Sequence, residues 1–352
     1  MKQPLQLLTA IILMLSPQLL QAKIWRVNNS GAPADFTAAQ TANNSPSVVN
    51  GDTLHFEPSG TDYGSLSLTK RLVIIGNGYF LGSPVVNANP NLQANSAMSK
   101  IIGGLSVYST ASNSVIMGMT IDNVYIGWDA LTSNVVFKRN YCGTLQVYAG
   151  GTNNTVLSQN FVDAYIAGTS GAHTNMVITN NIVGTYIQFD ANDNGIFSNN
   201  VTCVAPGNNY INLTGFTVRN NIRAQNPNAQ GVNLVSCIVQ NNMDCTGYSG
   251  FGIADGNLGN VNIGNVFAGW PTAGLNSYDG RFALKGGSPA AGAGYGGSDM
   301  GPILNASNNS NNMADTYVLS GMPNVPSVFK LDAPATVNTS TMNITVSTRT
   351  NN

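Results

Sequence analysis

Short apolar segments recur along the middle of the chain about every twenty residues, and each leads into a bend that is rich in asparagine. Seven segments align: VIMGMTI (115–121), VVFKRNY (135–141), TVLSQNF (155–161), MVITNNI (176–182), GIFSNNV (195–201), FTVRNNI (216–222) and CIVQNNM (237–243). The sixth position holds Thr120, Asn140, Asn160, Asn181, Asn200, Asn221 and Asn242, with Asn265 as a looser eighth member. A repeat of this length predicts a solenoid, in which each unit buries its apolar face only against its neighbours.

Two solenoid architectures have this period and an asparagine column, the leucine-rich repeat and the parallel β-helix. A leucine-rich repeat needs several leucines in each unit. The apolar residues of the stretch 113–265 are mainly Val, Ile, Tyr and Phe, which favour strands, with only about six Leu. The pattern therefore predicts an all-β solenoid of about ten coils, each with two or three short parallel strands stacked about 4.8 Å from the next coil.

The asparagine column is expected to form a hydrogen-bonded ladder inside this solenoid. Stacked side-chain amides can bond from one coil to the next, and an asparagine in the bend tolerates a left-handed backbone. The residue after each asparagine is apolar in every unit and is expected to form the inward core stack. These residues are Ile121, Tyr141, Phe161, Ile182, Val201, Ile222, Met243 and Val266.

A second column appears when the strand after each bend is aligned: VYIGW (124–128), LQVYA (145–149), AYIAG (164–168), TYIQF (185–189) and NYINL (209–213). The third position is always aliphatic, so the second position is expected to face outward, because side chains alternate along a strand. It holds Tyr125, Gln146, Tyr165, Tyr186 and Tyr210. This stripe suits stacking on sugars or anchoring a partner protein. Two alternatives are that the rings only support one another and that the C-terminal tail covers them.

Further motifs flank the repeat. Residues 34–44 (ADFTAAQTANN) read as a short helix that caps the open end, and residues 51–81 contain a GDT strand, a YG turn and a K-x-L-x-I-x-G strand. Residues 287–303 contain an SPA…GAG…D-x-G element. Together with the asparagine column, about residues 24–303 resemble exported bacterial right-handed parallel β-helix proteins of the pectate-lyase-like superfamily. The resemblance implies one capped right-handed β-helix over residues 23–303, which the last element closes.

The two ends of the chain differ from the repeat. Residues 1–22 read as a secretory signal peptide, with Lys2 before an apolar run and Leu20-Gln21-Ala22 at the cleavage site. No later stretch is long and apolar enough to span a membrane. Residues 304–352 read as a polar linker and a short β tail that ends in MNITVSTRT (342–350). The mature protein is expected to be monomeric and secreted, periplasmic or on the outer cell surface.

The numbers and spacing of the charged residues, histidines and cysteines argue against several classes of function. The 352 residues include only 14 Lys or Arg and 15 Asp or Glu, with a net charge of −1, so nucleic acid is not an expected partner. His55 and His173 are far apart in the sequence, which argues against a Ser-His-Asp triad or a histidine-rich metal site. The four cysteines lack CxxC spacing and read as isolated thiols, with a bridge between Cys237 and Cys245 as the alternative.

The family resemblance implies polysaccharide chemistry. Lyases of this superfamily use a Lys or Arg base and a cation held by Asp or Glu, and hydrolases use paired Asp residues. No vWiDH-like or RxPxxR-like segment and no NTD, DD or RIK cluster occurs in this chain. The candidate catalytic residues, chosen by position alone, are Arg223 and Asp244. They are expected to face each other on neighbouring coils about 4.8 Å apart. A surface ion pair that supports stacking is the simpler interpretation, and a catalytic role is the alternative.

Calcium is the one cofactor that the sequence indicates. Residues 190–195 match the first half of a calcium loop, D-x-N-x-N-G, with Asp190, Asn192 and Asn194 as the oxygen ligands. Val201 stands where such a loop has its bidentate glutamate, so a polar turn is the simpler interpretation.

Two classes of function remain open. The fold resemblance implies a secreted or cell-surface protein that contacts polysaccharide, either as a binding protein or as a relative of polysaccharide lyases or glycoside hydrolases. The low charge, the few candidate acid and base residues and the C-terminal tail favour an adhesin-like or structural surface protein without catalysis. A groove with clustered Asp near an Arg or Lys would indicate a lyase, and an uncharged face would indicate an adhesin.

Overall fold

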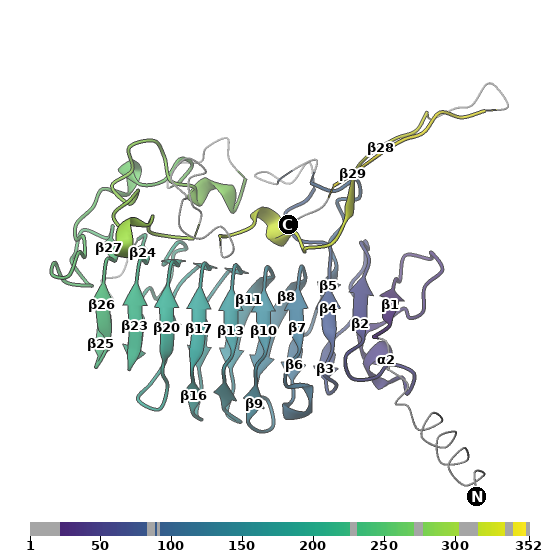
Figure 1. Ribbon diagram of the computed structural model, residues 1–352, viewed down its shortest axis with the longest axis horizontal. Helices are drawn as coiled ribbons and strands as arrows, with labels where there is room; N and C mark the ends of the chain where they lie inside the picture. The colour runs from purple at the N-terminus through teal and green to yellow at the C-terminus, as the bar shows by residue number, and fades with distance from the viewer. Residues whose placement is uncertain are drawn as a thin grey trace, which may run out of the picture.

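The computed structural model describes residues 22–82, 89, 92–225, 231–270, 277–302, 316–334 and 341–349. Within these residues the chain forms a parallel β-solenoid of about nine turns with very little helix. Figure 1 shows the turns standing side by side along the long axis of the molecule. The expected all-β solenoid is confirmed, and its cause is the apolar repeat, because each repeat supplies one turn.

A ten-stranded parallel sheet forms the first wall of the solenoid. Its strands follow in the order β1 (Ile24–Val27), β2 (Thr53–Phe56), β4 (Val73–Ile75), β7 (Val115–Met117), β10 (Val136–Lys138), β13 (Val156–Ser158), β17 (Met176–Thr179), β20 (Gly195–Ser198), β23 (Phe216–Arg219) and β26 (Ile238–Gln240). Each strand is three or four residues long, and from β10 to β26 each continues into the bend that carries the asparagine.

A fourteen-stranded sheet forms the second wall, in two ribbons that diverge from the long strands β8 (Thr120–Ile126) and β11 (Tyr141–Val147). One ribbon contains β14 (Phe161–Val162), β18 (Ile182–Val183), β21 (Val201–Thr202), β24 (Ile222–Arg223) and β27 (Met243–Asp244). The other contains β15 (Ile166–Gly168), β19 (Ile187–Gln188), β22 (Ile211–Thr214) and β25 (Val232–Val235). Toward the N-terminus the sheet includes β3 (Leu66–Leu68), β5 (Lys100–Ile101) and β6 (Leu105–Val107). A small third sheet contains β9 (Thr132–Ser133), β12 (Thr152–Asn153) and β16 (His173–Thr174).

The lumen of the solenoid is a continuous apolar core. Every second side chain of the ten-stranded sheet points into it and is fully buried, as for Ile116, Phe137, Leu157, Ile178, Phe197 and Val218. Helix α2 (Ala39–Asn44) contributes Ala39 and Ala42 to this core at the N-terminal end. Phe251, from the loop after β27, joins the same core at the other end. Both ends of the solenoid are therefore closed by the chain itself.

A second apolar cluster lies outside the lumen and corrects the expected core stack. Phe161, Ile182, Val201, Ile222 and Met243 pack against segments from the C-terminal part of the chain. We name residues 258–270, 277–302 and 316–322 the outer cover; Figure 1 shows these segments along one side of the solenoid. Strand alternation explains the difference, because a residue that follows an inward asparagine must face outward. Its apolar character comes from the cover that buries it.

Three of the residues expected in that core stack have other places. Tyr141 is only partly buried against the second cluster, and Val266 belongs to the outer cover itself. Ile121 does face the lumen, because the strand register pairs it with Cys142, so the first repeat is shifted by one residue from the sequence alignment.

The C-terminal part of the chain forms an antiparallel hairpin of β28 (Ser327–Asp332) and β29 (Thr345–Arg349). It projects from the body in Figure 1 and is joined to it where the Ala94 N–H donates to the Val328 carbonyl at 2.8 Å. Strand β29 lies within the segment that the sequence predicts as a β tail. The first 21 residues of the expected signal peptide and residues 304–315 of the expected linker lie outside the described residues. No helix in the described part of the chain is long and apolar enough to span a membrane.

Candidate functional site

The asparagine column forms one uninterrupted hydrogen-bonded stack in the lumen. Asn140, Asn160, Asn181, Asn200, Asn221 and Asn242 are all fully buried. Each Nδ2 donates to the Oδ1 of the next asparagine at 2.9–3.4 Å, and each backbone N–H donates to the same Oδ1. The Oδ1 of each asparagine therefore accepts the hydrogen bonds that the bend of the preceding turn donates.

Two details of this stack differ from the sequence alignment. Asn257, and not Asn265, continues the stack after Asn242, and it escaped detection because it comes only 15 residues later. Asn265 is exposed in a short 3-10 helix, Ile263–Asn265. The left-handed residue of each bend is also the one before the asparagine, for example Arg139 (φ 57°) and Asn180 (φ 56°).

Arg223 and Asp244 lie inside the solenoid and not on its surface. The Arg223 Nη1 donates to Asp244 Oδ2 at 3.2 Å, and the two side chains are 2% and 0% exposed. Asp244 also accepts hydrogen bonds from the Gly250 N–H at 2.8 Å and from the Thr246 N–H at 3.0 Å, which belong to the loop that carries Phe251. The surface interpretation is wrong because the second residue after an inward asparagine faces inward again. A polymer outside the solenoid has no access to this pair.

Two of the three predicted calcium ligands accept hydrogen bonds from backbone N–H groups. Asp190 Oδ1 accepts from the Asn192 N–H at 3.0 Å, and Asn194 Oδ1 accepts from the Asn175 N–H at 2.9 Å in the preceding turn. Asp193, which was not a predicted ligand, is buried and accepts from the His173 N–H at 2.9 Å. Burial raises the pKa of Asp193 to about 6. No cluster of three His, Cys, Asp or Glu side chains that could hold a metal occurs among the described residues.

The four cysteines are free thiols, and Cys237 and Cys245 form no bridge. Cys142 and Cys203 are fully buried. Burial raises the pKa of Cys203 to about 11 and that of Cys142 further. Both thiols are therefore protonated at neutral pH and are poor nucleophiles.

The tyrosine stripe is present, but its register has a step. Tyr165, Tyr186 and Tyr210 stack with ring centroids 4.4 and 4.6 Å apart and interplanar angles of 9° and 7°. Gln146 pairs with Tyr125 in the preceding turn and with Ala167 in the following turn. Tyr125 and Gln146 therefore lie two positions along the strand from the column of Tyr165, Tyr186 and Tyr210. Because the rings stack along the solenoid axis, Tyr186 presents only its edge and hydroxyl to solvent.

A second aromatic group continues this surface, and its members were only partly found from the sequence. Trp128 stacks on Tyr148 with centroids 4.8 Å apart and an angle of 13°, and Tyr125 contacts both rings. Trp128 is 39% exposed. Ile126 and Val147 are paired in adjacent turns, but Tyr148 directly follows Val147 whereas Trp128 comes two residues after Ile126, so no shared position in the repeat identified this pair.

Side-chain amides connect the two aromatic groups. Gln146 Nε2 donates to the Tyr165 hydroxyl, and the Tyr210 hydroxyl donates to Gln188 Oε1 at 2.8 Å. The amide column continues where Asn233 donates to Asn212 at 2.9 Å. We name this surface the polar-aromatic face; it comprises Tyr125, Trp128, Gln146, Tyr148, Tyr165, Tyr186, Gln188, Tyr210, Asn212 and Asn233.

The strands that carry the polar-aromatic face have little charge. Asp122 is the one charged residue within strands β8, β11, β15, β19, β22 and β25. Beyond the strand ends, Asp129 directly follows Trp128 and Asp190 comes two residues after Gln188. Burial among the neighbouring rings, together with repulsion from Tyr165 and Tyr210, raises the pKa of Tyr186 to about 12. Its hydroxyl therefore remains a hydrogen-bond donor at every physiological pH.

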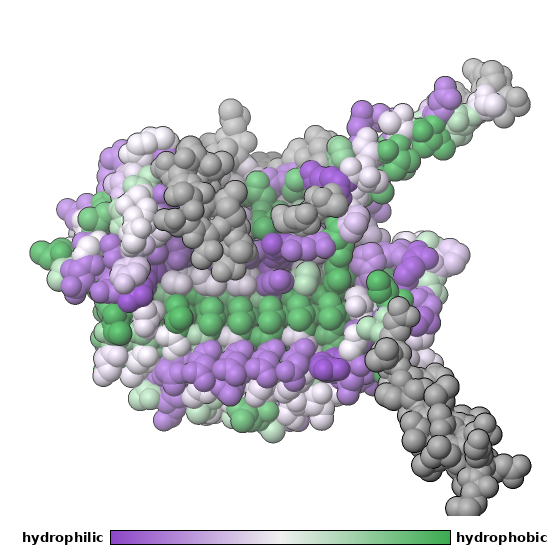
Figure 2. All heavy atoms as spheres, in the orientation of Figure 1, coloured by the Kyte–Doolittle hydropathy of each residue, from purple (hydrophilic) through white to green (hydrophobic). Residues whose placement is uncertain are grey.

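The ten-stranded sheet presents a different surface. Figure 2 shows a row of hydrophobic side chains across it, with a hydrophilic row alongside. The strand register identifies the hydrophobic row as Val73, Val115, Val136, Val156, Val177, Ile196 and Ile238, interrupted by Thr217. These side chains are aliphatic and offer no hydrogen bonds, so this surface differs in chemistry from the polar-aromatic face.

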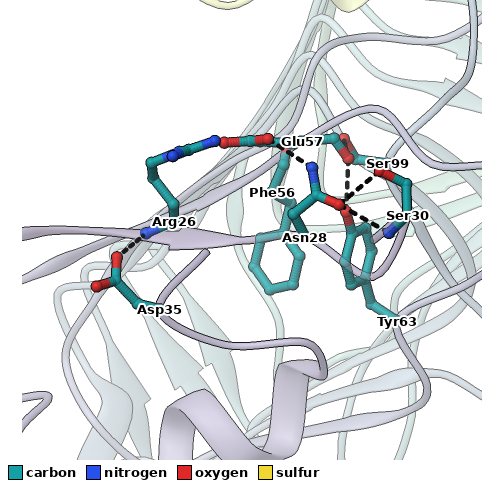
Figure 3. Close-up of polar contacts among 8 residues, drawn as sticks. All are labelled: Arg26, Asn28, Ser30, Asp35, Phe56, Glu57, Tyr63 and Ser99. Atoms are coloured by element: carbon teal, nitrogen blue, oxygen red, sulfur yellow. Dashed lines mark hydrogen bonds and ion pairs between the residues drawn. The ribbon is translucent and has the colours of Figure 1, made fainter. Parts of the chain in front are cut away.

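A cluster of charged groups lies at the N-terminal end. Figure 3 shows Glu57 between Arg26 and Asn28, whose amide donates to Glu57 Oε2 at 2.6 Å. The Tyr63 hydroxyl donates to the Glu57 carbonyl at 2.7 Å. Partial burial favours the neutral carboxyl, but the hydrogen bonds from Arg26 and Asn28 outweigh it and hold the pKa of Glu57 below its usual range. Both carboxylate oxygens are engaged in joining β1 to β2, so this cluster has a structural role.

A Glu57→Gln variant tests that role through pH. Because the folded-state pKa of Glu57 is depressed, its contribution is present above the unfolded-state pKa and is lost as pH falls through the folded-state pKa. We expect wild type to lose stability, relative to the variant, on acidification below about pH 5, by less than about 1 kcal/mol after solvent screening. Urea unfolding followed by circular dichroism from pH 7 to pH 3 measures this difference. Parallel pH curves for the two proteins would contradict it.

Comparisons with protein-family models, curated proteins and solved structures find no match for this chain.

Proposed function

We propose that this protein is a polysaccharide-binding β-solenoid that contacts its ligand through the polar-aromatic face, at the cell surface or outside the cell. The observation that carries the proposal is the continuous array of tyrosine hydroxyls and side-chain amides beside the exposed Trp128, on strands with a single charged residue. Hydroxyls and amides donate and accept hydrogen bonds, as sugar hydroxyls do.

The geometry of the rings defines what kind of contact is available. The stacked tyrosines offer hydroxyl groups and ring edges, and Trp128 offers an indole on the same surface. Successive rungs recur about every 4.8 Å along the solenoid, so six turns extend over about 25 Å. An extended, uncharged strip of this kind suits a linear neutral polysaccharide that lies along the solenoid axis.

Binding, rather than bond cleavage, is the function that the accessible groups support. The residues singled out for catalysis, Arg223 and Asp244, are buried in the lumen. On the polar-aromatic face, Asp122 has no charged neighbour in the strands that form it. General acid–base catalysis needs a positioned acid or base at the reacting bond, and the proposed contact needs none.

An adhesin-like role is the second candidate. It is supported by the projecting hairpin, on which Leu331, Ile344 and Val346 are each more than half exposed. Exposed apolar side chains on a paired strand suit attachment to a partner surface. This candidate requires a hairpin-dependent interaction and no contribution from the polar-aromatic face.

A triple variant, Tyr165→Phe, Tyr186→Phe and Tyr210→Phe, tests the proposed function. It keeps the ring stack and removes only the hydroxyls, two of which bond Gln146 and Gln188. We therefore expect a folded protein with a slightly lowered unfolding midpoint and at least about tenfold weaker binding. Affinity electrophoresis against a panel of neutral and uronate polysaccharides provides the measurement. Trp128→Ala is expected to act in the same direction.

The matched control lies on the other wall. Val156→Thr and Val177→Thr change two outward side chains of the ten-stranded sheet with little change in shape, and binding should be retained. Full affinity in the tyrosine triple variant, or loss of affinity in the valine control, would overturn the assignment of the face. Ultraviolet absorbance from unsaturated uronate products would show that the protein is a lyase and not only a binding protein. Attachment that depends only on the hairpin would favour the adhesin.

A further inference from the structure

A cavity of about 220 Å³ lies between the solenoid wall and the outer cover. Phe161, Asp163 and Pro206 line it from the solenoid, and Trp270, Tyr278 and Arg281 line it from the cover. It is separate from the polar-aromatic face, whose residues do not line it. Segments about a hundred residues apart in the sequence meet here, so the cavity exists only in the folded protein.

The cover side of the cavity is held by a buried carboxylate. Arg281 belongs to the 3-10 helix η3 (Gly280–Phe282), which Asp279 precedes. Asp279 is fully buried and accepts from the Gly280 N–H at 3.0 Å, the Asn89 amide at 2.8 Å and the Ser320 N–H at 2.6 Å. These bonds connect three separate segments of the chain and hold the turn that presents Arg281.

The two charged side chains that line this cavity, Arg281 and Asp163, form no ion pair with each other. Among the described residues no hydrogen bond or ion pair reaches the side chain of Arg281 or of Asp163, and Arg281 Nε is buried without a hydrogen-bond partner. The Arg281 guanidinium lies over the Tyr278 ring, 4.3 Å from its centroid. An arginine that stacks on an aromatic ring keeps its N–H donors available for an anion.

We propose that this cavity binds a small zwitterion, an α-amino acid with an aromatic or large aliphatic side chain. The ligand carboxylate would accept hydrogen bonds from Arg281, its ammonium group would face Asp163, and its side chain would lie among Phe161, Trp270 and Tyr278. A simple anion would be repelled by Asp163, and a simple cation would be repelled by Arg281. A zwitterion is attracted to both groups.

The size of the cavity agrees with this ligand class. Pockets for drug-sized ligands have volumes of about 300–1,000 Å³, so 220 Å³ suits a single amino acid better than a segment of polymer. This site is thus independent of the polysaccharide contact proposed above, and either can fail without the other.

Isothermal titration of the purified protein at pH 7 tests the proposal with three matched probes. L-Phenylalanine carries both charges, phenethylamine only the positive one, and 3-phenylpropionate only the negative one. We expect L-phenylalanine to bind at least about tenfold more tightly than either single-charge analogue. Equal affinity for the three probes, or no binding of L-phenylalanine at millimolar concentration, would overturn the proposal.

Asp163→Asn supplies the sharper readout, because Asp163 is exposed and makes no side-chain hydrogen bond within the described residues. The variant is expected to bind L-phenylalanine more weakly and 3-phenylpropionate more tightly than wild type, since the repulsion is removed. Asp255→Asn, at an exposed position outside the cavity lining, is the matched control and should change neither affinity. Arg281→Met is expected to abolish binding of both carboxylates. Unchanged affinities in Asp163→Asn would contradict the assigned role of this carboxylate and the proposal with it.

Discussion

An Asn181→Ala variant is expected to lose about 2–6 kcal/mol of unfolding free energy, at about 1–3 kcal/mol for each of two buried donors left without a partner. These donors are the backbone N–H of Asn160 and one of its two Nδ2 N–H groups, which both bind Asn181 Oδ1 at 3.0 Å; the other Nδ2 N–H keeps its bond to the Phe137 carbonyl. The variant also removes donors to the carbonyls of Leu157 and Thr179, at 2.9 and 3.1 Å. No water from solvent can replace these bonds, because Asn181 is fully buried.

The measurement is urea unfolding followed by circular dichroism, with Asn233→Ala as the matched control. Asn233 is an exposed strand residue that donates one hydrogen bond, to Asn212 at 2.9 Å. Its removal should cost less than about 1 kcal/mol, because water can take the place of the lost partner. Similar losses in the two variants would mean that the buried stack contributes no more than a surface amide pair.

Asp244→Ala is expected to destabilise the protein by about 3–5 kcal/mol, the usual cost of removing one partner from a buried ion pair. Arg223 would keep its charge in the lumen without the carboxylate that it contacts at 3.2 Å. The loop 245–257 would also lose the bonds from Thr246 and Gly250 that fix it over the end of the solenoid. The position of Phe251 in the core depends on that loop.

A double variant separates the charge from the loop attachment, and an exposed ion pair supplies the control. In Arg223→Met, Asp244→Leu the unpaired charge is absent, so part of the lost stability should return, because apolar replacement of a buried pair is often neutral. Asp332→Ala removes the exposed partner of Lys330 and should cost less than about 1 kcal/mol. A double variant as unstable as Asp244→Ala would assign the whole effect to the lost loop bonds.

The local pattern was sufficient for the solenoid and its ladder. A buried amide must find a hydrogen-bond partner, and a repeat of about twenty residues places the same amide at the same point of every turn. This is why the positions of Asn140, Asn160, Asn181, Asn200, Asn221 and Asn242 could be read from the chain. Asn257 could not, because its turn is shortened to 15 residues by the loop that closes the end.

The candidate sites depended more on the fold. The tyrosine column could be found because alternation identifies the outward positions, but its register could not. Gln146 pairs with Ala167, so Tyr165 lies two positions earlier along its strand than the sequence alignment places it. The inward position of Arg223 and Asp244 does not follow from their residue types. A charged residue is expected to face outward, yet a charge can be buried when its partner lies on the next turn.

Taken alone, the sequence determined the solenoid, its asparagine stack and the strands that carry the exposed tyrosines, because these follow from interactions between neighbouring turns that repeat with the chain. Only the tertiary structure decided where the outward apolar residues pack, which is against the outer cover. Phe161, Ile182 and Val201 are buried by the outer cover, which begins at residue 258, and the cavity beside Arg281 is formed at that contact. Such long-range packing has no period, so no pattern along the chain predicts it.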